Sequence, residues 1–490
     1  MMPQRKGEGI YNVVVIGAGT AGLVTAAGTA GLGGRVALIE RHKMGGDCLN
    51  FGCVPSKALI SSARLIDRIN RAEEWGLRKT EPQFDFNEVL TRMRARRAQI
   101  APNDSQERLE SLGVDVFRGQ AKFRSANEVE VDGAILRAKT FVIAAGSRAA
   151  IPKVEGIESV PYFTNETIFD ELNVKPASMI VLGGGPIGCE LGQTFGRLGV
   201  QVTIMQRGSR LLPREDRDVT EFLEKRLKDE NISVMTNSEV RSVARADKKI
   251  DIKIAQRTSG EPARETNIVA DTLLICIGRQ PNIDNLGLDS IGVEADKRGV
   301  KVNSYLQTSQ PHIYAAGDIV GPFLFTHMAD AHARVVVRNI LVPFQFLRQK
   351  IDYAVVPWCT YVDPEIATVG LNETAAREKN IEYDLIVQKL AEVDRAVVES
   401  EESGFAKILV AKGTDKVLGA TLVCESAGDL LHEFVLAMKC RVGLGTISST
   451  IHVYPTLAEL ARKIGDKYNK TRLTPTARKV FGWLYRRNLH

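Results

Sequence analysis

The sequence contains the same glycine-rich motif twice, each time directly after a short apolar run, at 12–16 and at 178–182. Both motifs have the spacing G-x-G-x-x-G, and their glycines are Gly17, Gly19, Gly22, Gly183, Gly185 and Gly188. Between a strand and a helix, these glycines allow a tight turn, close approach of a pyrophosphate and close packing of helix on strand. The sequence therefore predicts two βαβ units that each bind a dinucleotide, and hence two cofactors.

The second predicted strand of each unit ends near the residue that distinguishes a free ribose 2′-hydroxyl from a 2′-phosphate. Glu40 lies 18 residues after the last glycine of its motif (40 − 22), where a carboxylate binds ribose hydroxyls. The equivalent residue of the second unit is Gln206 (206 − 188 = 18), and Arg207 and Arg210 follow it. Arginines in this place pair with a 2′-phosphate, so we expect NADPH at the second site. NADH is the alternative, if these arginines are solvated turn residues.

Two cysteines, Cys48 and Cys53, follow the first motif and lie five residues apart. They close a very short loop beside a predicted cofactor cradle, which indicates a redox-active disulfide rather than a structural one. Residues five apart point away from each other on a regular helix, so we expect Cys48 in an approach loop and Cys53 at a helix start. The helix N-terminus favours a thiolate on Cys53 and leaves Cys48 as the exposed attacking thiol. Lys57 shares the helix face of Cys53.

The segment 45–57, G-G-D-C-L-N-F-G-C-V-P-S-K, resembles the redox loop of the class I pyridine nucleotide-disulfide oxidoreductases. This family includes dihydrolipoamide dehydrogenase, glutathione reductase and mercuric reductase. The resemblance implies FAD at the first site and electron flow from NADPH through the flavin to the Cys48–Cys53 pair. It also implies that Lys57 lies at the flavin edge and pairs with Glu190, on the helix after the second motif.

Three further segments look like family motifs in the expected order. Apolar runs end at Gly146 and Ser147 and again at Gly278, and both resemble the crossings between the nucleotide domains. The segment 313–318 resembles the second flavin motif, in which Asp318 bonds the ribityl chain of FAD. Each run alone is typical of ordinary core. Together they are similar to an FAD domain that an NADPH domain interrupts.

The expected fold is α/β, with two Rossmann-like nucleotide-binding domains and an α+β C-terminal dimerisation domain. The resemblance assigns residues 1–155 and 285–350 to the FAD domain, 156–284 to the NAD(P) domain and 351–475 to the dimerisation domain. Alternating strands at 405–410 and 417–423 agree with the last assignment. A homodimer follows, because in this family the C-terminal domain of one subunit completes the disulfide site of the other.

The sequence departs from most of the family at Tyr454. Dihydrolipoamide and glutathione reductases have a histidine there, five residues before a glutamate that this chain keeps as Glu459. A phenol, with a pKa near ~10, cannot shuttle protons at neutral pH as an imidazole does. His452, two residues earlier, is a substitute base if the backbone shifts, or else a histidine bonded within the interface.

This departure favours a mercuric reductase-like flavoprotein, because a soft cation binds thiolates and needs little general-base help. The cysteine pairs that such enzymes carry near their chain ends are not found here, so we expect a relative whose acceptor is open. The alternatives are a dihydrolipoamide dehydrogenase-like enzyme, a quinone reductase and a non-enzymatic redox-sensing flavoprotein. We expect no resident metal ion.

The composition bears on which partners the chain binds. A net charge of +6 over 490 residues, with scattered basic residues, gives no support for nucleic-acid binding. The polar start at 1–9 and seven irregularly spaced cysteines favour a cytoplasmic protein.

The tail 476–490 mixes apolar and basic residues and predicts a short amphipathic helix. We expect it to pack on its own dimer, with a membrane surface or another partner as the alternative.

Overall fold

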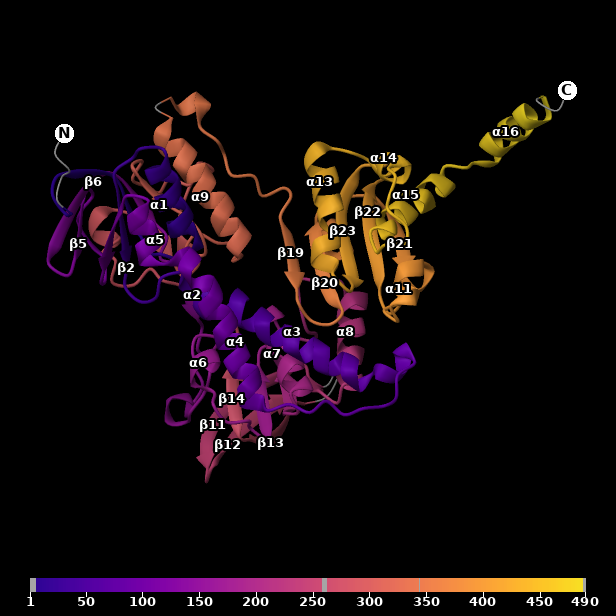
Figure 1. The fold of residues 1–490 in the computed structure, drawn as a ribbon, viewed down its shortest axis with the longest axis horizontal. Helices are drawn as coiled ribbons and strands as arrows, with labels where there is room; N and C mark the ends of the chain where they lie inside the picture. Colours follow the sequence, from indigo (N-terminus) through magenta and orange to yellow (C-terminus); the bar gives the residue numbers. More distant parts are fainter. Residues whose placement is uncertain (1–5, 258–261, 343, 488–490) are drawn as a thin grey trace. The chain divides into compact units, whose positions relative to one another are not determined.

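A computed structural model of the chain describes residues 6–257, 262–342 and 344–487. Residues 1–5 of the predicted FAD domain and 488–490 of the predicted tail lie outside this description. The chain forms two compact units (Figure 1). The first holds the segments up to Ile66, Gln83–Leu211 and Leu227–Asp352, and the second holds Asp67–Pro82, Leu212–Arg226 and the chain from Tyr353 on. Both nucleotide motifs lie in the first unit.

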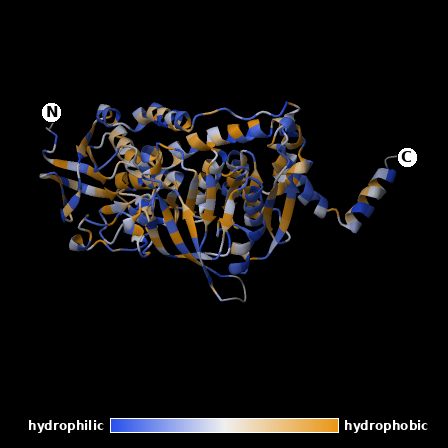
Figure 2. Ribbon diagram, turned by 90° about the horizontal axis from the view of Figure 1, so that it is seen from below, coloured by the Kyte–Doolittle hydropathy of each residue, from blue (hydrophilic) through white to orange (hydrophobic). Residues whose placement is uncertain are grey.

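The first nucleotide fold is built on a seven-stranded sheet. Its strands in order are β3 (Val114–Arg118), β2 (Val36–Glu40), β1 (Ile10–Ile16), β6 (Ala134–Ile143), β5 (Glu128–Val131) and β4 (Lys122–Ser125), and β18 (Ile313–Ala315) also pairs with β6. The strands β3, β2, β1, β6 and β18 run parallel, whereas β4, β5 and β6 pair antiparallel. Strands β1 and β2 are apolar because both of their faces are buried: the helical residues 21–26 and 329–336 cover one face, and residues of β4, β5 and the segment 286–300 cover the other. Figure 2 shows hydrophobic strands of this kind in orange.

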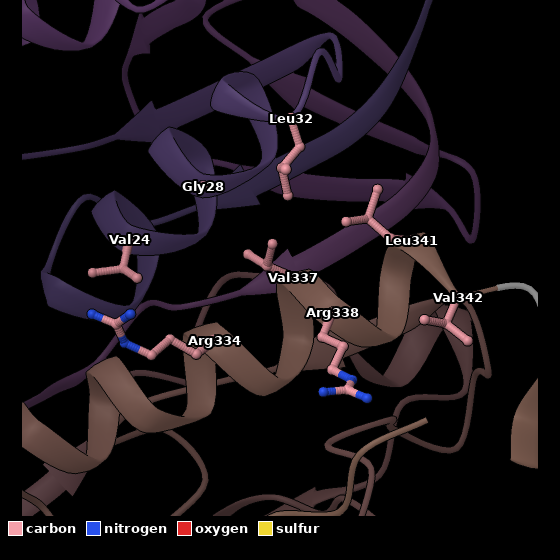
Figure 3. A pocket seen from close by; sticks show the side chains of 8 residues that line it. All are labelled: Val24, Gly28, Leu32, Arg334, Val337, Arg338, Leu341 and Val342. Atoms are coloured by element: carbon pink, nitrogen blue, oxygen red, sulfur yellow. The ribbon is translucent and has the colours of Figure 1, made fainter. Parts of the chain in front are cut away.

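Helices α1 (Thr20–Gly31) and α9 (Thr326–Leu341) pack against each other on this sheet. The two helices meet at Gly28, where a Cβ would lie 3.4 Å from the Val337 side chain, an ordinary contact distance. A hollow of about 350 Å³ lies beside this contact. Figure 3 shows the residues that line it: Val24, Gly28, Leu32, Arg334, Val337, Arg338, Leu341 and Val342. The packing fixes the start of α9 relative to the first glycine motif.

The second nucleotide fold repeats the predicted βαβ pattern. Its parallel sheet has the order β10 (Ser233–Met235), β9 (Gln201–Met205), β8 (Ser178–Leu182) and β14 (Thr272–Ile275). Helix α7 (Pro186–Arg197) follows β8 directly after the second glycine motif. An antiparallel sheet of β11 (Ser238–Ala246), β12 (Lys249–Gln256) and β13 (Arg264–Ala270) completes it. Two Rossmann-like folds are therefore present, as the glycine motifs predicted.

The second unit contains a five-stranded antiparallel sheet. Its order is β19 (Pro357–Thr360), β20 (Glu365–Gly370), β23 (Val417–Cys424), β22 (Phe405–Ala411) and β21 (Tyr383–Lys389). Helices α13 (His432–Cys440), α14 (Leu444–Ser449) and α15 (Glu459–Thr471) contribute residues to the core beneath it. The predicted α+β architecture of this region is confirmed.

A buried lysine joins the segment Leu212–Arg226 to this sheet. The Lys407 side chain is 2% exposed, and its Nζ lies 3.0 Å from Asp216 Oδ2, 2.9 Å from Asp218 Oδ2 and 2.6 Å from Glu373 Oε1. Burial alone would lower the pKa of Lys407, but hydrogen bonds to the three carboxylates raise it above its usual value. The ammonium therefore stays charged and neutralises a cluster of acids.

Lys407→Met should destabilise the second unit by about 3–5 kcal/mol, because it leaves buried carboxylates without their counter-charge. Urea unfolding followed by tryptophan fluorescence measures this, since Trp75, Trp358 and Trp483 all lie in the second unit. Lys412→Met is the control: its exposed pair with Asp384 should contribute nothing measurable. Equal unfolding midpoints for the two variants would contradict the role given to Lys407.

Candidate active site

The two cysteines lie on either side of a break between two helices. Cys48 is in the five-residue helix α2 (Gly46–Asn50), and Cys53 is the first residue of α3 (Cys53–Asn70). The expectation that Cys48 lies in a loop is wrong, because α2 forms one helical turn that packs on α4 (Phe86–Ile100). Cys48 is half-buried for the same reason, and Cys53 rather than Cys48 is the more exposed thiol.

The environment favours a thiolate on Cys53. The Cys48 thiol donates a hydrogen bond to the Cys53 sulfur, which lowers the pKa of Cys53 to about 6 against the opposing effect of burial. The Thr326 hydroxyl, 3.3 Å from that sulfur, and the positive charge of Lys57 lower it further. The same hydrogen bond, together with burial, raises the pKa of Cys48. One negative charge therefore rests on Cys53 at neutral pH.

The ion pair expected between Lys57 and Glu190 is present. Lys57 Nζ donates to Glu190 Oε2 at 2.8 Å, and the Glu190 side chain is 7% exposed. Lys57 lies one turn after Cys53 on α3, and Glu190 lies on α7 after the second glycine motif. The pair therefore links the thiol helix to the second nucleotide fold.

The first glycine motif has the shape of a dinucleotide cradle. A Cβ at Gly22 would lie 1.8 Å from the carbonyl oxygen of Gly17, so only glycine fits there. Helix α1 begins at Thr20 without a side-chain cap, which leaves backbone N–H groups directed at a phosphate position. The buried Glu40 accepts a hydrogen bond from Ala18 N at 2.7 Å, which fixes its carboxylate at the end of β2. These residues fit FAD.

The second cradle has the same construction with a neutral residue at its end. Gln206 Oε1 accepts from Gly184 N at 3.1 Å, so Gln206 occupies the place that Glu40 has in the first fold. The next residue, Arg207, is exposed, and Arg210 is half-buried. The cap residue of α7 is Gly185, which has no side chain to bond the N–H groups at the start of the helix. This cradle also fits a dinucleotide.

A cluster that the sequence did not predict surrounds Asp318. Ser147 Oγ donates to Asp318 Oδ2 at 2.7 Å, and Arg279 Nε donates to Ser147 Oγ at 2.7 Å. Arg279 also pairs with Asp47 of α2 at 3.0 Å. Burial raises the pKa of Asp318, and Arg279 and Ser147 oppose this. Because Arg279 bridges the second flavin motif and the turn that carries Cys48, it fixes both.

Two other residues near the site carried no sequence signal. Thr326, which contacts Cys53, is the first residue of α9 and belongs to no motif. His332, six residues further along α9, is fully buried, and its Nδ1 accepts a hydrogen bond from Gly317 N at 3.2 Å. Burial lowers the pKa of His332 to about 4, so its ring is neutral and acts as an acceptor. Only the fold could bring them to the flavin motif.

The residues around Tyr454 belong to the second unit, whereas Cys48 and Cys53 belong to the first. Tyr454 Oη donates to Asp394 Oδ2 at 3.1 Å, and this hydrogen bond raises the pKa of the phenol. His452 has its Nε2 3.0 Å from Glu433 Oε1 and its Nδ1 2.9 Å from the carbonyl oxygen of Thr450. Both ring nitrogens of His452 are therefore engaged within this unit.

Glu459, the glutamate that the chain keeps, is 4% exposed at the start of α15. Its Oε1 accepts from Arg462, whereas its Oε2 is buried and has no hydrogen-bond partner among the described residues. A buried carboxylate oxygen without a donor is uncommon. Glu459 Oε2 is therefore an acceptor for which the described residues supply no donor.

Within the described ranges, no group of three or more His, Cys, Asp or Glu side chains is arranged to hold a metal ion. None of the helices in the described part of the chain is both long enough and apolar enough to cross a membrane.

Comparisons with known proteins agree with this geometry. Residues 11–335 match the pyridine nucleotide-disulphide oxidoreductase family, and residues 356–463 match its dimerisation domain. A mercuric reductase of Lysinibacillus sphaericus is 36% identical over 92% of this chain and 81% of its own length. A dihydrolipoyl dehydrogenase of Geobacillus stearothermophilus is 32% identical over 92% and 95%.

The fold is also similar to a solved flavoprotein. The Cu(II) complex of the HOCl-induced flavoprotein disulfide reductase RclA from Escherichia coli matches with a TM-score of 0.83 and 25% identity, over 94% of this chain and 99% of that one. Mercuric reductases and dihydrolipoyl dehydrogenases are similarly related to this chain, so relatedness alone leaves the acceptor open. The chain belongs to the pyridine nucleotide-disulphide oxidoreductases, flavoenzymes that use FAD and NAD(P)H and carry a dimerisation domain.

Proposed function

We propose that this protein uses NADPH to reduce a thiophilic metal ion, with Hg²⁺ as the first candidate, at the Cys48–Cys53 pair. The observation that carries the proposal is the state of Tyr454, whose hydroxyl is bonded to Asp394 where disulfide reductases of the family have a proton-shuttling histidine. In the homodimer, the C-terminal domain of one subunit completes the thiol site of the other.

The residues divide the work as follows. Bound FAD would supply two-electron transfer between NADPH and the thiol site. Gly17, Gly19 and Gly22 would hold its pyrophosphate, and Asp318 would bond its ribityl chain. Cys53 contributes a thiolate and Cys48 a second sulfur, and two soft ligands suit a soft cation. The net reaction, Hg²⁺ + NADPH → Hg⁰ + NADP⁺ + H⁺, delivers no proton to the acceptor.

A disulfide acceptor makes a different demand. Its reduction releases a thiolate that a nearby acid must protonate, which is the role of an imidazole with a pKa near ~6.5. The bond to Asp394 raises the pKa of Tyr454, and His452 is held by Glu433 and Thr450. The mercuric reductase relatives and the copper complex of the RclA structure also support a metal acceptor.

The first prediction concerns the Cys53 thiolate. Because the pKa of Cys53 is lowered to about 6, the thiolate is present above this pH and is lost as pH falls through it. The NADPH-reduced protein should show a long-wavelength charge-transfer absorbance that falls to half near this pH. Cys53→Ser should abolish the absorbance, and Cys48→Ser should show it without any reductant. A reduced wild type without such a band would rule the assignment out.

The second prediction concerns the nucleotide. NADPH should have the higher kcat/KM, and Arg207→Glu should lower the preference for NADPH over NADH at least about tenfold, through loss of a charge-assisted contact to the 2′-phosphate. Arg245→Glu, which changes an exposed arginine of the same predicted domain, is the matched control and should leave the preference unchanged. Wild-type protein that uses NADH as well as NADPH would refute the assignment of Gln206 and Arg207.

The third prediction tests the acceptor. Purified protein with NADPH should reduce Hg²⁺ faster than lipoamide, glutathione disulfide or a quinone. Tyr454→His should raise disulfide reduction by about tenfold to a hundredfold, because we expect an imidazole there to donate to Glu459 Oε2, for which the described residues supply no donor, and to act as an acid.

The control is Tyr454→Phe, which removes the Asp394 bond without adding a base and should not raise disulfide reduction. Robust lipoamide turnover by the wild type would overturn the proposal in favour of a dihydrolipoamide dehydrogenase-like function. A quinone reduced fastest, with Cys48 and Cys53 dispensable, would point instead to direct reduction by the flavin.

A further inference from the structure

The last described element, α16 (Pro475–Arg487), lies beyond residue 463, where the family match ends. Its start is encoded locally, because Thr474 Oγ1 accepts a hydrogen bond from Ala477 N at 3.2 Å and Pro475 occupies the first turn. None of its described residues is buried. The role proposed for the thiol site assigns nothing to this helix.

The sequence of α16 separates apolar and basic side chains on the helix surface. Ala477, Val480, Phe481 and Leu484 follow the i, i+3, i+4, i+7 spacing of a single face. The last three remain 51%, 50% and 41% exposed, respectively. Figure 2 shows that the helix carries both strongly hydrophobic and strongly hydrophilic residues.

Every charged residue of α16 is basic. Lys479 and Arg486 lie on the face opposite the apolar residues, whereas Arg478 and Arg487 lie at its margins. Each margin also carries an aromatic residue, Tyr485 on one side and Trp483 on the other, and the Arg487 guanidinium lies 5.7 Å from the Trp483 ring. Aromatic and cationic side chains at both margins suit the boundary between headgroups and acyl chains.

Charge decides which occupant this face fits. The helix holds four cations and no carboxylate, and the exposed Lys470 and Arg472 precede it. A symmetric contact between two copies of α16 would bring eight like charges together, which costs free energy. An anionic surface attracts the same charges, and each cation near such a surface strengthens the attachment.

We propose that α16 binds the surface of an anionic phospholipid membrane, with its axis in the plane of the surface. Val480, Phe481 and Leu484 insert at the boundary of the acyl chains, and Lys479 and Arg486 face the headgroups. The attachment is peripheral, because thirteen residues are too few to span a bilayer. It places a flavoenzyme at a surface without engaging either nucleotide fold.

Co-sedimentation of the full-length FAD-loaded protein with vesicles tests this. We expect binding to phosphatidylcholine vesicles that contain about 30% phosphatidylglycerol to exceed binding to pure phosphatidylcholine at least tenfold. Raising the salt from about 0.1 M to about 1 M should release the protein. Anionic vesicles should shift the tryptophan emission to the blue in the wild type, and Trp483→Phe should lose this shift.

Two double variants separate the contributions of charge and apolar contact. Lys479→Glu/Arg486→Glu and Phe481→Ser/Leu484→Ser should each weaken vesicle binding at least about tenfold. Lys248→Glu/Lys297→Glu makes the same charge change at exposed lysines outside α16 and should bind as the wild type does. NADPH oxidation without vesicles should be unchanged in all three.

The following results would overturn the proposal: equal binding to neutral and anionic vesicles, no binding to either, or vesicle binding that survives both α16 variants. Size-exclusion chromatography tests the other possible occupant of this face, the partner subunit of the dimer. If the α16 variants convert dimers to monomers, the helix serves the subunit interface and the membrane assignment is wrong.

Discussion

The hydrogen bond from the Cys48 thiol to the Cys53 sulfur sets the chemistry of the site. It exists because the chain is helical on both sides of Phe51 and Gly52 but not through them, so two residues five apart face each other. An uninterrupted helix would separate the sulfurs. The break also places Cys53 at a helix start, where unpaired N–H groups add to the stabilisation of negative charge.

The surrounding residues hold this turn in place. The Arg279 guanidinium binds Asp47 at one end and Ser147 at the other, and Ser147 binds Asp318. The turn that carries Cys48 and the motif assigned to the ribityl chain therefore share one cation that is 11% exposed. Because removal of one partner would leave buried charges unpaired, the cluster resists independent movement of its parts.

The sequence predicted those features that depend on local spacing. Glycine positions and apolar runs are patterns that span about twenty residues. They predicted strands β1 and β2, the second βαβ unit and the equivalence of Gln206 with Glu40. The features that it missed depend on tertiary packing. Thr326 and His332 reach the site only because α9 packs on α1, and Lys407 collects acids from segments roughly thirty to two hundred residues away. The helical state of Cys48 was missed because a five-residue helix is stabilised by its packing on α4 and not by its own sequence.

The two halves of the proposed reaction have different requirements, and the residues of this chain meet only one of them fully. Electron delivery needs a thiolate, a cation near it and two dinucleotide cradles, and all of these residues are in place. Proton delivery needs a group that titrates near neutral pH. Tyr454 instead donates to Asp394, and the Oε2 of Glu459 has no hydrogen-bond partner among the described residues. A site that delivers electrons readily and protons poorly favours acceptors that take electrons alone. In the function proposed here, the choice between a metal ion and a disulfide as acceptor therefore depends on the side chain at residue 454.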